Sequence, residues 1–408
     1  MGKNGKKCCS LQGAQQAILT KIQKLPAEIV LLKEAQQRIV FKDVVAVAPQ
    51  PSFDESTRDG YVVALHLGFD EKTNRFEIVD EIPAGKPYLK TLASGTACKI
   101  MTGGCVPKGG ARVVPYENCV ERNGEVIVPE NLLQSTETFI RKVGSGIAQG
   151  EWLVSAEVLI QAGHLALLSS CGMHSVAVTT RPLVGYVCTG SELTAEPEEL
   201  GGGRKFSSNS FLLEGLLSSV GACPLNFGIM EDSQQELLNL FSKVSIDGLD
   251  VMITTGGMGP GKYDLVERAF VEAGGKVIFN AIAMRPGKSI LFGILGHTLF
   301  FGLPGPPNAV RTLLNVLVGP ALLAMQGVRG ALPKKVQAHL QHQVKIKRND
   351  VLRLKDGVLT IEEGRCFVRF AGRLEVGNCF ILLSSGQAHY CEGELVEVYL
   401  TVDLSARL

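Results

Sequence analysis

Residues 250 to 264 read Asp250-Val-Met-Ile-Thr-Thr-Gly-Gly-Met-Gly-Pro-Gly-Lys-Tyr-Asp264, so that an apolar run enters a glycine-rich turn and ends at a carboxylate. The run predicts a buried parallel strand, and the turn would expose backbone N–H groups to which a phosphate or another anion can bind. The positions expected to make these contacts are Thr255, Gly256, Gly257 and Gly259. The stretch therefore predicts a nucleotide- or cofactor-phosphate site, and its alternative is a turn that serves tight packing alone.

Strand and helix patterns alternate around this stretch. Strands are expected at Leu183–Cys188, Val251–Thr254, Ser289–Leu295 and Thr298–Leu303, and helices at Asn209–Val220, Leu237–Val244, Leu265–Ala273 and Asn308–Met325. Such alternation is typical of a mostly parallel, doubly wound sheet, which we place over residues 178–327.

The pattern changes on both sides of this α/β region. Short β-like runs broken by Gly and Pro predict a β module before it and a second β domain after residue 327. Helical spacing of apolar residues is found at Leu11–Val40 and again at Gly150–Gly172. The fold class is therefore α/β plus β, in a multidomain chain.

Composition narrows the class of protein. The chain has 408 residues, which is too long for one ordinary core. Lys and Arg number 41 against 40 Asp and Glu, so the basic surface required for general binding of nucleic acid or anionic membranes is missing. The sequence leads us to expect no signal peptide and no membrane-spanning segment, since no apolar stretch has the length that either requires. We expect a cytoplasmic protein with no nucleic-acid or membrane partner.

The cysteine pattern indicates reduced thiols. The chain has 11 cysteines without paired C-x-x-C spacing, which favours buried free thiols and no zinc site. The adjacent Cys8 and Cys9 have no pattern that assigns them a role.

A set of motifs occurs in one order along the chain. They are Ser52-Phe-Asp-Glu-Ser-Thr-Arg-Asp-Gly-Tyr61, Ile100-Met-Thr-Gly-Gly104 with Val113-Val-Pro-Tyr-Glu117, Cys188-Thr-Gly-Ser-Glu-Leu193, Thr254-Thr-Gly-Gly257 to Asp264, and Arg285-Pro-Gly-Lys288 with Leu303-Pro-Gly-Pro-Pro307. Together they resemble the molybdopterin molybdenumtransferase family, the MoeA type that includes the E domain of gephyrin. The resemblance covers nearly the whole chain.

The resemblance implies a four-domain homodimer. Its parts would be a helical linking domain at 11–48 plus 140–177, a β module at 49–139, a molybdopterin-binding α/β domain at 178–327 and a C-terminal β domain at 328–408. It implies an enzyme that inserts molybdenum from molybdate into adenylylated molybdopterin, with release of AMP and help from Mg²⁺. A molybdopterin adenylyltransferase would supply the substrate.

Residue chemistry and the resemblance together select the site. Glu192 and Asp264 follow strand ends, where carboxylates can hold Mg²⁺ beside a substrate phosphate. Arg285 and Lys288 flank a Pro-Gly turn and carry the charge that a molybdate dianion needs. We expect Asp59, Glu192, Asp264 and Arg285 to be catalytic, and Thr102, Thr255, Gly256, Gly257, Gly259, Lys288, Pro304, Pro307 and Arg353 to bind the cofactor. Asp59 would reach the site from the partner subunit's β module.

Departures from the family pattern leave alternatives open. Ser207, Ala281 and Pro306 stand where members of the resembling family commonly have other residues. Ala281 replaces a frequent Lys, and Pro306 replaces an Asn and removes one donor. One alternative is a pterin-binding or scaffold paralogue with reduced turnover, and another is a CinA-like nucleotide hydrolase. Sequence does not distinguish molybdate from tungstate, and does not tell whether a paralogue does most of the insertion.

Overall fold

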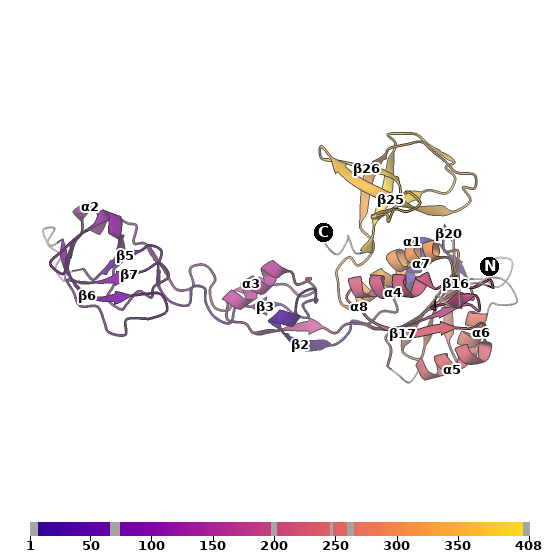
Figure 1. Cartoon of the computed structure of the whole chain (residues 1–408), viewed down its shortest axis with the longest axis horizontal. Helices are drawn as coiled ribbons and strands as arrows, with labels where there is room; N and C mark the ends of the chain where they lie inside the picture. The colour runs from indigo at the N-terminus through magenta and orange to yellow at the C-terminus, as the bar shows by residue number, and fades with distance from the viewer. Residues whose placement is uncertain (1–6, 66–73, 197–201, 245–247, 259–264, 403–408) are drawn as a thin grey trace. The chain divides into compact units, whose positions relative to one another are not determined.

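The computed structural model describes residues 7–65, 74–196, 202–244, 248–258 and 265–402. The chain forms two compact units (Figure 1). Unit 1 comprises Met1–Glu28, Gln37–Phe41 and Val178–Leu408, and unit 2 comprises Ile29–Gln36 and Lys42–Ala177. Asp264 and Gly259 lie outside the described residues, so nothing is concluded about their geometry.

Unit 1 is built on a seven-stranded sheet of order β1-β19-β21-β22-β18-β14-β17. The strands are β1 (Cys8–Cys9), β14 (Leu183–Thr189), β17 (Cys223–Met230), β18 (Val251–Thr255), β19 (Lys276–Ile282), β21 (Ser289–Leu295) and β22 (Thr298–Leu303). β22, β18, β14 and β17 are mutually parallel, as is β1 to β19, whereas β21 runs antiparallel to both of its neighbours. The prediction of a mostly parallel sheet is confirmed.

Helices cover both faces of this sheet, as Figure 1 shows. They are α1 (Leu11–Leu19), α4 (Ser208–Ser219), α5 (Gln234–Val244), α6 (Leu265–Glu272), α7 (Pro307–Leu313), the π-helical turn η4 (Leu314–Val318) and α8 (Gly319–Met325). Side chains alternate along a strand, so Tyr186 packs with α1, α4 and the α7–α8 helix, while Val187 packs with α5 and α6. The sheet is therefore doubly wound, as the alternation predicted.

The helix Pro307–Met325 lies at the centre of unit 1. It is long and apolar enough to cross a membrane by length and composition, which corrects the expectation that no segment is. However, 78% of its apolar window is buried within the protein, as expected for a core helix. Its hydrophobicity is thus explained by the sheet that it covers.

The C-terminal part of unit 1 is a second sheet, of order β20-β25-β26-β23-β29-β27, with an additional β25–β27 pairing. The strands are β20 (Met284–Arg285), β23 (Lys335–Leu340), β25 (Leu352–Glu362), β26 (Arg365–Phe370), β27 (Cys379–Leu383) and β29 (Leu395–Leu400), with the small pair β24 (Val344–Lys345) and β28 (His389–Tyr390) beside them. The β25–β27 pairing closes the sheet into a barrel, which we call the C-terminal barrel.

Unit 2 contains a six-stranded sheet of order β8-β5-β7-β6-β10-β9. The strands are β5 (Gly60–Val63), β6 (Arg75–Ile82), β7 (Thr96–Ile100), β8 (Arg112–Pro115), β9 (Val120–Arg122) and β10 (Glu125–Ile127). The β5 side chains are buried on both faces, since Tyr61 and Val62 belong to different core clusters.

The remaining elements are short. They are β2 (Ala27–Leu31), η1 (Leu32–Glu34), β3 (Val44–Val45), β4 (Glu55–Ser56), η2 (Tyr116–Asn118), α2 (Glu130–Leu133), β11 (Ile140–Arg141), β12 (Trp152–Val154), α3 (Ala162–Ser170), β13 (Ser175–Thr179), β15 (Leu193–Thr194) and β16 (Lys205–Phe206).

The helices expected at both ends of the linking domain are shorter than predicted. The prediction of helix over Leu11–Val40 is wrong beyond Leu19, because extended strand β2 begins at Ala27, directly after a proline that disfavours helix before it. The α1 helix itself packs into the unit 1 core through Leu11 and Ile18, so it belongs with the α/β sheet. At Gly150–Gly172 only α3 is helical.

Candidate functional site

A cleft of about 810 Å³ opens where parallel strands of the unit 1 sheet end. β14, β18 and β22 are paired in register, and the chain leaves all three at the same edge. The cleft is lined by Thr189, Gly190, Glu192, Leu193, Lys205, Phe206, Ser207, Ser208, Asn209, Asp232, Thr255, Gly256, Gly257, Met258, Ser289, Pro304, Gly305, Pro306 and Pro307. The structure thus brings together six predicted site residues, namely Glu192, Thr255, Gly256, Gly257, Pro304 and Pro307.

The glycine turn is shaped by close backbone approach. Gly256 has a φ of +103°, and a Cβ added there would lie 2.2 Å from the carbonyl oxygen of Thr189. Its N–H donates to the carbonyl of Leu303 at 3.0 Å, which ties the turn to β22. Gly257 is left-handed with a φ of +61°. Only glycine fits the first position without strain, which supports the interpretation of this segment as a built turn.

Two helices begin at the cleft. Ser207 precedes α4 and Pro306 precedes α7, and neither provides a side-chain hydrogen bond that caps the first turn. The first N–H groups of a helix have no partner within the helix, and the helix dipole makes this end attractive to anions. Pro307 contributes no such donor, since proline lacks an N–H.

Asn209 connects these elements and was not selected from the sequence. Its side-chain amide donates to the carbonyl of Gly305 at 2.8 Å and to Oγ1 of Thr255 at 3.4 Å. The residue is almost fully buried, at 6% exposure. Asn209 therefore fixes the start of α4 to the end of β18 and to the segment Pro304-Gly-Pro-Pro307, which we call the proline loop. Its position after Ser207-Ser208 at the expected helix start was the available signal.

Two carboxylates border the cleft among the described residues. Glu192 is exposed and lies after β14, as predicted. Asp232 follows β17 and was not selected from the sequence. Its N–H donates to Oγ of Ser191 at 3.3 Å, and its Oδ2 accepts from the N–H of Ser191 at 3.5 Å. In the described part of the chain no group of three or more His, Cys, Asp or Glu could hold a metal. Magnesium bound by Glu192 and Asp264 stays a prediction.

The predicted basic residues Arg285, Arg353 and Lys288 do not all lie at one place. Arg285 and Arg353 face each other in register on β20 and β25 and line a separate hollow of about 390 Å³. Arg285 lies 3.9 Å from Asp350, and Nε of Arg353 donates to the carbonyl of Arg348 at 2.7 Å. Lys288 is exposed and lines neither space. The structure therefore brings Arg285 together with Arg353 at this hollow, and Lys288 is not among its lining residues.

Ala281 is buried in the sheet, so a lysine in its place would not extend into solvent toward an oxyanion. It is 3% exposed on β19, where its partners in the sheet are Cys8 and Ser289. A lysine at this position would bring an ammonium ion and extra volume into the core, which costs stability. Cys9 lies on the same strand as Cys8, and its Sγ is 3.7 Å from the Ala281 carbonyl. Both cysteines thus extend the sheet.

In unit 2, the predicted Asp59 and Thr102 contact each other. Oδ1 of Asp59 accepts hydrogen bonds from the Thr102 N–H at 2.6 Å and from its hydroxyl at 2.8 Å. These two donors, the backbone N–H first, hold the pKa of the Asp59 carboxyl below its ordinary value. The carboxylate is thereby kept charged and oriented on the surface of the β module.

Comparison with known proteins gives a consistent result. Residues 9–172 match the MoeA N-terminal region (domain I and II), and residues 185–324 match a probable molybdopterin binding domain. A molybdopterin molybdenumtransferase from Bacillus subtilis is 30% identical over 389 residues, which cover 91% of this chain and 89% of that protein. Its counterpart from Staphylococcus epidermidis is 27% identical over 381 residues, with 91% and 90% covered.

A solved structure agrees over nearly the whole chain. The crystal structure of the molybdopterin biosynthesis MoeA protein from Pyrococcus horikosii matches with a TM-score of 0.80 at 26% identity. The match covers 97% of this chain and 99% of that one. The likeness thus extends through both compact units rather than the α/β region alone.

Proposed function

The chain belongs to the molybdopterin molybdenumtransferase family, and from this premise we propose that it inserts molybdenum from molybdate into adenylylated molybdopterin, with release of AMP. It is a transferase of molybdenum cofactor biosynthesis. The observation that carries the assignment to a site is the cleft at the ends of β14, β18 and β22, which gathers most of the predicted phosphate-binding residues.

The cleft suits a phosphate-bearing pterin. The Gly256 N–H is already used by the Leu303 carbonyl, so the donors for phosphate oxygens would be the N–H of Gly257 and those at the start of α4. Water adds across the phosphoanhydride, so that the P–O bond between the phosphates breaks and AMP leaves with one phosphate. The dithiol sulfur atoms of the pterin then bond to molybdenum, and one oxygen of molybdate leaves as water with the two thiol protons. Asn209 contributes by fixing the walls, since its amide group spans α4, the proline loop and β18.

Mg²⁺ fits the acidic groups at this cleft. It keeps several waters in proteins and takes one or two carboxylates beside substrate phosphates. Glu192 and Asp232, which line the cleft together, are groups of this kind, and Asp264 remains the predicted second ligand. When bound, Mg²⁺ would neutralise charge on the phosphates.

The oxyanion is assigned to the hollow between Arg285 and Arg353. A dianion taken from water needs fixed cations, and planar guanidinium groups bind oxyanions through paired N–H donors. The hollow also includes Lys355. Molybdate and tungstate would both fit this chemistry.

The assembly and location of the enzyme are part of the same proposal. A homodimer would let Asp59, oriented by Thr102, serve the cleft of the partner subunit. A molybdopterin adenylyltransferase would act immediately upstream, because the substrate carries an adenylyl group. We place the enzyme in the cytoplasm, without a nucleic-acid or membrane partner. A monomer in solution would contradict the shared site.

Turnover measurement tests the proposal. Purified protein is mixed with adenylylated molybdopterin, molybdate and Mg²⁺, and AMP and molybdenum-loaded pterin are quantified. Equal amounts of the two products support the insertase.

A pterin-binding scaffold is the second candidate, because Ser207 and Pro306, which depart from the family pattern, both line the cleft. Tight binding of the adenylylated pterin without AMP release would favour that alternative. The CinA-like alternative is disfavoured, since the matched MoeA N-terminal region lies outside the α/β domain.

A further inference from the structure

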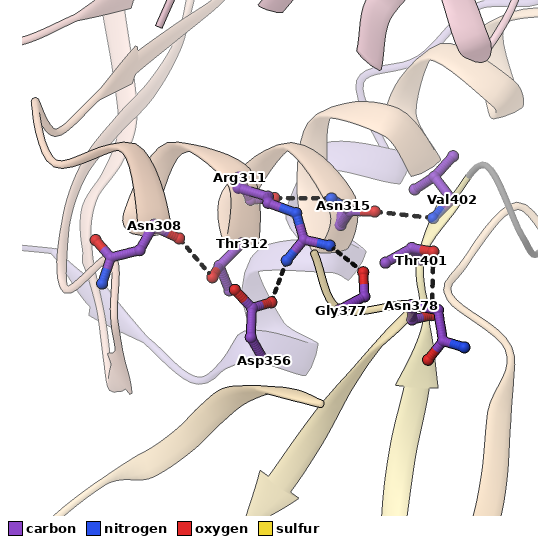
Figure 2. Close-up of polar contacts among 9 residues, drawn as sticks. All are labelled: Asn308, Arg311, Thr312, Asn315, Asp356, Gly377, Asn378, Thr401 and Val402. Carbon is purple, nitrogen blue, oxygen red and sulfur yellow. Dashed lines mark hydrogen bonds and ion pairs between the residues drawn. The ribbon is translucent and has the colours of Figure 1, made fainter. Parts of the chain in front are cut away.

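One arginine on the core helix holds the C-terminal barrel at several points. Arg311 lies on α7, and its side chain is only 15% exposed. Its guanidinium forms an ion pair with Asp356 of β25 and donates to the carbonyl of Gly377 at 2.6 Å. The same group lies 5.1 Å from the ring centre of Phe380 on β27. Figure 2 shows Arg311 between the helix and both of its polar partners.

A second contact follows one helical turn later. Asn315 donates to the Arg311 carbonyl at 2.9 Å and accepts the N–H of Val402 at 2.8 Å. The neighbouring Thr401 donates from both its N–H and its hydroxyl to the Asn378 carbonyl, each at 3.1 Å. Arg311 and Asn315 thus attach one face of the core helix to β25, to the segment before β27 and to the chain after β29 (Figure 2).

These attachments lie beside the hollow of about 390 Å³ that Arg285 and Arg353 line, which we call the arginine hollow. Asp356, which pairs with Arg311, lines the hollow together with Arg353 of the same strand. Asn308 and Thr312 of α7 line it from the other side. Arg285 and Arg353 are joined directly only by the two-residue pairing of β20 with β25, and the contact of Arg311 with Asp356 is a second support that holds β25 against α7 beside this pairing.

We propose that Arg311 is a positioning residue that sets the separation of the Arg285 and Arg353 guanidinium groups by fixing the C-terminal barrel to the core helix. Asp350 lies 3.9 Å from Arg285 and Asp356 lines the hollow, so these carboxylates offset part of the repulsion between the two arginines, and a support for β25 then fixes where Arg353 lies. A largely buried arginine with a carboxylate and a carbonyl as partners is such a support, because breaking one link leaves the other polar groups unpaired. The inference rests on the proposed role of this hollow in oxyanion binding.

The test compares Arg311→Ala and Arg311→Lys with Lys335→Ala in the full chain. Lys335 pairs with Glu397 at 3.0 Å within the barrel, away from α7, so its replacement removes an ion pair without releasing the barrel. Molybdate alone is titrated by calorimetry, and KM is measured separately for molybdate and for adenylylated molybdopterin. Hydrogen exchange of the β25 amides reports on the attachment without requiring activity.

Arg311→Ala should raise the molybdate Kd and KM by about 10- to 100-fold, with little change in the KM for the pterin, which binds at the other cleft. Amides of β25 should exchange about tenfold faster or more. Arg311→Lys should fall between wild type and Arg311→Ala, because it keeps the charge facing Asp356 but loses the forked second donor. Lys335→Ala should match wild type.

Several outcomes would overturn the inference. One is unchanged exchange and unchanged molybdate affinity in both Arg311 variants. Another is an equal loss for the two substrates with a lowered melting temperature, which indicates general destabilisation. If Arg311→Ala does not fold, an Arg311→Lys variant indistinguishable from wild type is decisive against the inference. If the wild type itself binds no molybdate, the proposed function fails, while the exchange data still decide whether Arg311 fixes β25.

Discussion

Replacement of Gly256 by alanine should be among the most damaging single-methyl changes at the cleft. The added Cβ would lie 2.2 Å from the Thr189 carbonyl oxygen and 2.7 Å from its Oγ1. The carbonyl belongs to backbone rather than to a flexible side chain, and β14 is held in register against β18. Neither partner can withdraw without loss of strand pairing at the site.

The magnitude follows from two contributions. A side chain at a φ of +103° is strained, at a cost of about 1–3 kcal/mol. Overpacking against fixed atoms costs a further 1–3 kcal/mol or so. The free energy of unfolding should thus fall by about 2–6 kcal/mol. At about 2–4 °C per kcal/mol for a domain of this size, the melting temperature should drop by roughly 4–24 °C.

A matched control lies in the same cleft. A Cβ added to Gly305 would meet only the Cα of Gly256, at 3.8 Å, so Gly305→Ala has room. Melting temperature is measured by circular dichroism for both variants, and AMP release is measured below the lower transition. Gly305→Ala should differ from wild type by less than about 0.5 kcal/mol. Equal melting temperatures and equal turnover for the two variants would refute the close-approach argument.

Three further outcomes are expected. Glu192→Gln should lower Mg²⁺-dependent AMP release while leaving the melting temperature nearly unchanged, because this carboxylate is exposed; loss of stability with full activity would make it structural. Thr102→Val should raise the pKa of the Asp59 carboxyl, measured by NMR titration, because it removes one of the two donors that lower it. Because the pKa of Asp59 is lower in the folded protein than in the unfolded chain, the ionised carboxylate stabilises the fold at pH values above its unfolded-state pKa. This stabilisation is lost as the pH falls through the folded-state pKa. In the variant the folded-state pKa is higher, so the stabilisation should be lost at a higher pH. Exposed Cys8 should react with a disulfide reagent in the native protein, whereas Cys379, whose thiol pKa burial raises to about 12, should react only after unfolding.

Local pattern was sufficient for the elements that build the cleft. The strand Thr298–Leu303 is found with its predicted bounds, and β18 is one residue longer than predicted, ending at Thr255. Both are continuous apolar runs of strand length that end at Pro or Gly, and these residues mark the ends clearly. The prediction failed at Leu11–Val40, where apolar residues at helical spacing continue beyond α1. Beyond Leu19 the chain continues into strand β2 and the short 3-10 helix η1, and Ile29 of β2 is 77% exposed, so the spacing of these residues reflects no α-helix face.

Asp232 shows how one missed strand hides a site residue. It follows β17, whose sequence Cys-Pro-Leu-Asn-Phe-Gly-Ile-Met contains Pro224, Asn226 and Gly228, residues that are depleted in strands. β17 is the edge strand of the sheet, where such residues are tolerated since half of the backbone groups need no partner strand. Had β17 been expected, the strand-end rule that selected Glu192 would also have selected Asp232.

The arginine hollow could not be derived from local pattern at all, because its geometry depends on pairing between distant segments. The motif around Arg285 and the isolated Arg353 each gave a candidate cation, but only the parallel register of β20 with β25 places them opposite each other. In our proposal, the contact of Arg311 with Asp356 supports this pairing by holding β25 of the C-terminal barrel against α7. A sequence motif can therefore name the charges of an oxyanion site, while the distance between them is set by residues that belong to no motif.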